Sequence, residues 1–122
     1  MERQKAAEPE DLSRLFVQRA NARDVEGLVE LYEPDAVLVL TPGHIFVGHD
    51  KIRRAYQRLL AANPTFEPGV QAAAIRNGDL ALTSTRIPGA VTTEVAHRQP
   101  DGSWRWVIDS PNLLAGLPLT RG

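Results

Sequence analysis

Three turn motifs divide the second half of the chain, and they constrain its fold more than any other feature. Asn77-Gly78-Asp79, Pro88-Gly89 and Pro100-Asp101-Gly102 separate segments that are rich in apolar residues. Glycine adopts positive φ without steric cost and Asn or Asp tolerates it, so each motif predicts a hairpin. The segments 70–76, 80–87, 90–99 and 104–109 are therefore expected to form an antiparallel meander.

The first half of the chain carries helical periodicity instead. Apolar side chains recur at three- and four-residue spacing in three segments, which predicts helices near 9–23, from 25 to Pro34, and over 51–62. Asp24 and Asp50 are the expected caps of the second and third helices. The predicted buried faces are Leu12, Leu15, Phe16 and Ala20; Val25, Leu28, Val29 and Tyr32; and Ile52, Ala55, Tyr56, Leu59 and Leu60.

A short hairpin is expected between the second and third helices. Residues 36–40 are apolar at every position, which is typical of a strand buried on both faces. A turn at 41–44 then leads into a return strand at 45–47. Three helices followed by strands predict an α+β architecture whose helices pack on one face of the sheet.

Composition excludes several classes of protein. The formal net charge is −1, so no basic excess indicates nucleic acid or an anionic membrane surface. The chain has no cysteine, which excludes disulfides and thiolate metal sites and fits a cytoplasmic protein. No apolar run approaches the ~20 residues that a membrane span needs. The sequence contains no phosphate-binding loop and no dinucleotide-binding fingerprint, and its histidines are not clustered. Neither a cofactor nor a metal is therefore expected.

Three strings resemble the nuclear transport factor 2-like superfamily, which includes ketosteroid isomerases, limonene epoxide hydrolases and polyketide cyclases. They are NARDVEGLVELYEPDAVLV, VGHDKIRRAY and QPDGSWRWVIDSPN. The resemblance implies a cone-shaped, strongly bent mixed sheet packed on three helices. The length of 122 residues suits a single domain over 1–122, and loose termini are expected at 1–8 and 113–122. The resemblance also implies a homodimer formed through the outer sheet face, where Thr93, Val95, Arg105 and Val107 are expected.

The catalytic residues of the two best-known activities carry over poorly. Thr41 stands where a ketosteroid isomerase has its general base, and Phe16 stands where it has its oxyanion tyrosine. Of the acid–Arg–acid set of limonene epoxide hydrolases, the arginine and first acid would fall near Thr92 and Glu94, and the second acid on Trp106. Only Glu94 matches an acid in both families, so neither reaction is expected.

Glu94 is the predicted acid or base. Strand alternation puts it on one face with Thr92 and Ala96. If that face lines the cone, desolvation raises the pKa of Glu94 into a useful range. The alternative is an ion pair across the strands with Arg86 or Arg98.

The last strand and the third helix supply the other predicted pocket residues. The resemblance to the superfamily implies that Trp106 and Ile108 face the cavity, and Tyr56 is expected to place its hydroxyl at the cavity mouth. Asp109 alternates to the opposite face, where it would close a turn or a dimer contact, and it is a secondary catalytic candidate.

Together these residues predict a pocket protein of the polyketide-cyclase or isomerase kind. Its ligand would be a small hydrophobic or aromatic molecule. The other hypothesis is a non-catalytic ligand carrier or dimerising module.

Overall fold

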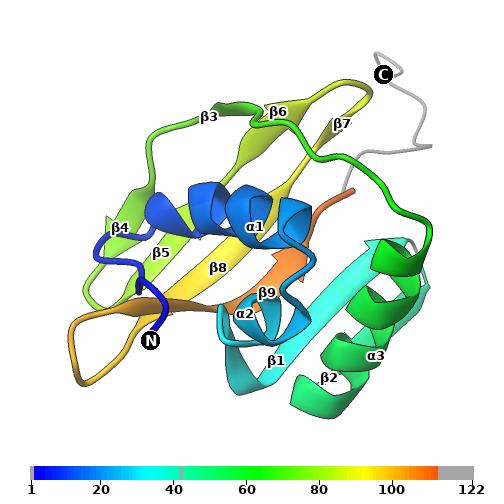
Figure 1. Cartoon of the computed structure of the whole chain (residues 1–122). Helices are drawn as coiled ribbons and strands as arrows, with labels where there is room; N and C mark the ends of the chain where they lie inside the picture. The colour runs from blue at the N-terminus through cyan, green and yellow to red at the C-terminus, as the bar shows by residue number, and fades with distance from the viewer. Residues whose placement is uncertain (1, 42, 113–122) are drawn as a thin grey trace.

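The computed structural model describes residues 2–41 and 43–112 (Figure 1). Its helices are α1 (Asp11–Asn21), α2 (Val25–Val29) and α3 (His49–Ala61). Its strands are β1 (Tyr32–Thr41), β2 (His44–Val47), β3 (Val70–Gln71), β4 (Ile75–Asn77), β5 (Leu80–Thr83), β6 (Thr85–Ile87), β7 (Ala90–Val91), β8 (Thr93–Arg98) and β9 (Trp104–Ser110). The predicted tail at 113–122 lies outside the described residues.

The strands form one large mixed sheet and one small sheet. The large sheet has the order β2-β1-β9-β8-β5-β4, and the small sheet has the order β3-β6-β7. β1 and β9 run parallel, whereas the other strand pairs are antiparallel. The predicted hairpins lie at Gly78, Gly89 and Gly102, each with positive φ. This arrangement confirms the predicted α+β fold with three helices and a bent mixed sheet.

The long central hairpin bends where it passes from one sheet to the other. Each of the predicted strands 80–87 and 90–99 is interrupted by one residue, at Ser84 and at Thr92. Thr92 holds the two arms together, because its hydroxyl accepts from the Thr85 backbone N–H at 2.9 Å and its own N–H donates to the Thr85 carbonyl at 2.8 Å. The tip of the hairpin, β6 and β7, therefore turns away from the main sheet (Figure 1).

The ends of the helices follow local chemistry in part. The Asp24 carboxylate accepts from the Gly27 backbone N–H at 3.0 Å, which confirms the predicted cap of α2. The predicted cap of α3 at Asp50 is wrong. Gly48 occupies that position with φ 89°, and Asp50 lies in the first turn with its carboxylate 2.8 Å from the Arg53 guanidinium.

Helix α2 ends at Val29, so the prediction that Pro34 ends it is wrong. Pro34 lies inside β1, where the register against β9 shifts between Tyr32 and Val37. Proline lacks a backbone donor and is tolerated in strands at such irregularities. Parallel pairing with β9 therefore outweighs the local helical pattern around Tyr32.

The core lies between the helices and one face of the large sheet. The inward residues of β1 are Ala36 and Leu38, while Val37 and Val39 are half-buried, so burial on both faces of this strand is only partial. Packed together in the core are Leu12, Leu15, Ala20, Leu28, Val29, Ala36, Leu38, Ile52, Ala55, Tyr56, Leu60, Ala81, Ala96, Trp104 and Trp106. None of the described helices has the length and apolar character needed to cross a membrane.

Residues ahead of α1 are tied to the body of the protein, in contrast to the expected loose start. Ala6 is buried and its carbonyl accepts from the Trp104 backbone N–H at 2.9 Å. Arg3 forms ion pairs with Asp24 at 2.7 Å and Glu30 at 2.6 Å. These contacts fix the lead-in beside α2.

Candidate active site

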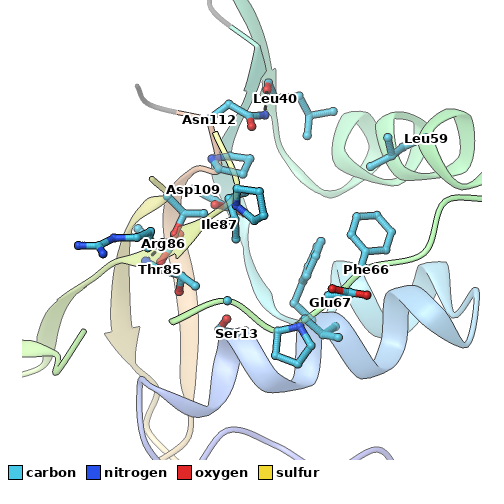
Figure 2. Close-up of a pocket in the computed structure, with 18 of the residues that line it drawn as sticks. Ser13, Leu40, Leu59, Phe66, Glu67, Thr85, Arg86, Ile87, Asp109 and Asn112 are labelled. Carbon is cyan, nitrogen blue, oxygen red and sulfur yellow. Dashed lines mark hydrogen bonds between the residues drawn. The ribbon is translucent and has the colours of Figure 1, made fainter. Parts of the chain in front are cut away.

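A cavity of about 940 Å³ opens between the helices, the bent hairpin and the end of the large sheet. Most of its lining is apolar, with aromatic rings prominent among the side chains. The rings of Phe16 and Tyr56 lie 6.0 Å apart between centroids, and those of Phe16 and Phe66 lie 5.5 Å apart. Figure 2 shows Phe66 and Leu59 on one side of this space and Asp109 on the other. Such a cavity suits a flat, hydrophobic ligand.

Of the six predicted pocket residues and the two predicted acids, all but one line this cavity. Those that line it are Phe16, Thr41, Tyr56, Thr92, Glu94, Trp106 and Asp109. Ile108 does not, since its side chain is 44% exposed on the opposite face of the sheet. The prediction that Ile108 faces the cavity is wrong.

Glu94 lies on the inward face of β8, as strand alternation predicts. It is only 5% exposed, and the Thr83 hydroxyl donates to its carboxylate at 2.7 Å. Burial raises the pKa of Glu94, and hydrogen bonds from Thr92 and Thr83 oppose that rise.

The alternative in which Glu94 pairs with an arginine is contradicted. Arg98 instead lies 2.6 Å from the Asp79 carboxylate, on the surface. Arg86 lines the cavity mouth, but its side chain is exposed and its guanidinium points away from the other lining residues (Figure 2). Glu94 therefore has hydroxyl partners rather than a charged one.

A β-bulge in β9 brings Asp109 into the cavity. Val95 pairs with Ile108 and Ala96 pairs with Trp106, so Val107 is an extra residue between them. One extra residue inverts the alternation of every side chain that follows it. Asp109 consequently faces inward and is 4% exposed, and the prediction that it faces away is wrong.

Asp109 is held by a tyrosine and stands directly opposite Glu94. The two acids are cross-strand partners, and the Tyr32 hydroxyl donates to Asp109 Oδ2 at 2.5 Å. Burial, and then the negative charge of Glu94, raise the pKa of Asp109 to about 8, against an opposing contribution from the Tyr32 hydrogen bond. At pH 7 Asp109 is therefore mostly protonated and neutral. The Glu94–Asp109 pair then carries fewer than two negative charges.

The two tyrosines extend this contact into a buried chain. The Tyr56 hydroxyl lies 2.5 Å from the Tyr32 hydroxyl, and both side chains are almost fully buried. Tyr32 is a core residue with a satisfied hydroxyl, and Tyr56 reaches the cavity wall from α3. The prediction that the Tyr56 hydroxyl lies at the cavity mouth is wrong, because that hydroxyl is buried against Tyr32. Sequence reasoning missed the link from Tyr32 to Asp109, because no local pattern indicates the bulge that turns Asp109 inward.

Thr41 and Asn112 are polar side chains of the cavity lining. Thr41, where a ketosteroid isomerase would carry its base, is exposed and its hydroxyl lies 2.5 Å from His44 Nδ1. Asn112 closes the same edge by donating to the Leu40 carbonyl at 2.6 Å. Over the ranges 2–41 and 43–112, no three His, Asp or Glu side chains group together as a metal site would need.

Solved structures of similar shape come from several bacteria. A protein with a cystatin-like fold from Nostoc punctiforme has a TM-score of 0.72 and 17% identity, over 89% of this chain and 75% of its own. A ketosteroid isomerase-like protein from Erwinia carotovora atroseptica has a TM-score of 0.62 and 18% identity, over 83% and 89%. A candidate dehydratase of the nuclear transport factor 2-like family from Streptomyces avermitilis has a TM-score of 0.63 and 20% identity, over 85% and 93%. At these identities the likeness concerns the fold.

The family itself follows from the sequence match. No curated protein of known function matches the chain. Residues 13–109 match the model of the SnoaL-like domain, which is most of the chain and includes both buried acids. The protein therefore belongs to the SnoaL-like family.

Proposed function

We propose that the protein catalyses proton transfer on a small hydrophobic or aromatic substrate bound in the cavity. The observation that carries this proposal is the pairing of Glu94 with Asp109 across β8 and β9, with both carboxyls buried at the cavity wall. Acid–base catalysis needs one group that accepts a proton and one that donates, with pKa values near the working pH. Two coupled carboxyls whose pKa values are both raised meet that need.

The two acids take different roles in this proposal. Asp109, which keeps its proton at pH 7, hydrogen bonds to a substrate carbonyl oxygen and stabilises the negative charge that develops there. Glu94 accepts a proton from the neighbouring carbon and then returns it. Return to a different carbon gives an isomerisation, and return to a departing hydroxyl group gives a dehydration that releases water.

Tyr32 and Tyr56 support Asp109 in this scheme. The hydrogen bond from Tyr32 fixes the orientation of the Asp109 carboxyl, and Tyr56 fixes Tyr32. They are positioning residues, since Tyr32 is wholly buried behind the acid. Structural neighbours described as ketosteroid isomerase-like and as a candidate dehydratase are in keeping with this class of reaction.

Turnover by single-residue variants tests the proposal. Hydrophobic ketones and β-hydroxy ketones are screened for deuterium exchange at the α-carbon and for loss of water. Glu94→Gln is expected to lower the rate by ~10²–10⁴-fold while circular dichroism stays unchanged. Thr93→Val, on the same strand but the opposite face, is the matched control. Equal rates in wild type and Glu94→Gln would leave the non-catalytic ligand carrier as the function.

We also propose that the protein forms a homodimer through the outer sheet face. A single apolar row crosses all six strands there by direct pairing: Ile75, Leu82, Val95, Ile108, Val37 and Val47. Among the described residues no helix covers this face, and Leu82 is therefore 43% exposed and Ile108 44% exposed. A second copy related by a twofold axis would lay one row against the other. A cytoplasmic location, in keeping with the lack of cysteine, belongs to the same proposal.

A further inference from the structure

We propose that the cavity binds an uncharged ligand and rejects carboxylates, because its buried end holds two acids and, among residues 2–41 and 43–112, no basic group that contacts them. This inference rests on the proposed function for the identity of the binding site. It extends that proposal by naming the charge of the substrate.

The charged groups around the cavity are unequally placed. The carboxyls of Glu94 and Asp109 lie inside, and their hydrogen-bond donors are Thr83 and Tyr32, both uncharged. Arg86 and the exposed Glu67 also line the cavity, and the Arg86 guanidinium is directed outward (Figure 2). A ligand that reaches the acids therefore meets negative charge without a compensating cation.

The remaining wall gives that charge little screening. Phe16, Phe66 and Trp106 form an aromatic surface, with the Phe16 and Trp106 ring centroids 6.2 Å apart. In such an apolar space, like charges repel several times more strongly than they do in water. A bound carboxylate must therefore either stand next to Glu94 or take up a proton, and both routes weaken its binding.

An amide and an acid of the same shape isolate the effect of charge. Binding of 2-naphthamide and of 2-naphthoate is measured by calorimetry at pH 7.5. The amide is expected to bind, and the carboxylate to bind about 100-fold more weakly. Neither probe has an enolisable carbon, so the outcome does not depend on turnover. A protein that binds the amide but catalyses nothing would contradict the proposed function and leave this inference standing.

Variants then assign the discrimination to the two buried acids. In the double variant Glu94→Gln with Asp109→Asn, the difference between the probes is expected to shrink below about tenfold. The matched control is Glu30→Gln with Asp50→Asn, which removes one Glu and one Asp charge at sites that do not line the cavity. It is expected to keep the full difference.

Three results would overturn the inference. They are equal binding of both probes to wild type, an undiminished difference in the cavity double variant, and failure of the amide to bind. If the double variant does not fold, Glu94→Gln alone decides at pH 6, because it removes the charge that faces the ligand while burial, the largest cause of the raised pKa of Asp109, remains.

Discussion

Glu94 and Asp109 stand opposite each other on β8 and β9, and both carboxyls are buried beside the cavity with no cationic side chain of the described part of the chain in contact. Isolated buried carboxylates are costly, so such groups keep their protons to higher pH. Burial raises the pKa of each acid, and the facing charge of Glu94 raises the pKa of Asp109 further. This difference underlies the proposed division into a base and an acid.

The pH dependence of stability should reveal Asp109. Its pKa is about 8 in the folded protein, against the ordinary value near 3.8, so the folded state holds a proton that the unfolded state releases. The stabilisation is therefore complete below about pH 4 and is lost as pH rises to about 8, by up to roughly 1.4 kcal/mol per pH unit. Urea unfolding across this window is expected to show a falling free energy of unfolding that Asp109→Asn flattens. An identical slope in the variant would contradict the assignment.

Thr83 should lower the pKa of Glu94, the proposed base. Its hydroxyl donates to Glu94 and lowers the pKa of that carboxyl, so Thr83→Val is expected to raise it further. Carbon-13 NMR titration of labelled glutamate side chains measures the change, with Glu94→Gln to assign the signal. Thr93→Val is the control, since alternation places Thr93 on the outer face and its removal should leave the Glu94 titration unchanged. A Glu94 pKa that stayed constant in Thr83→Val would show that the hydroxyl is not a partner in solution.

The tyrosine chain predicts unequal costs for two similar substitutions. Tyr32→Phe removes the donor to Asp109 and the partner of Tyr56, which leaves two buried polar groups unpaired and should cost about 1–3 kcal/mol of unfolding free energy. Tyr56→Phe leaves the Tyr32–Asp109 contact intact and should cost about 0.5–1.5 kcal/mol. Urea unfolding of both variants at pH 6 provides the comparison. Equal losses would mean that the two hydroxyls do not act as a chain.

The outer apolar row predicts the oligomeric state. Ile108 lies at its middle and Ile75 at its end. A lysine at the middle of the interface would bury an unpaired charge, so Ile108→Lys is expected to give a monomer in sedimentation equilibrium. Ile75→Lys, at the edge, should shift the dimer dissociation constant much less. A wild-type monomer at micromolar concentration would rule out this interface.

Local chemistry determined most of the fold. Asp24 capping, the three glycine turns and the apolar periodicity of α1 and α3 depend on neighbours close in the chain, so the sequence predicts them directly. Alternation placed Glu94 on one face with Ala96, because β8 is regular where it pairs with β5, and the tertiary structure shows that this face lines the cavity. The resemblance to the superfamily added the cone shape and the mixed character of the sheet.

Only the tertiary structure decided that Asp109 faces the cavity and that Pro34 lies within a strand. Both depend on β1 and β9, which lie far apart in the sequence and pair with irregular register. The extra residue at Val107 follows from how β9 fits β8, and no nearby residue signals it. Because side chains alternate with a period of two, that one residue exchanged Ile108 for Asp109 at the cavity wall. The sequence by itself thus determined the frame and one acid, and long-range strand pairing decided which residue would face it.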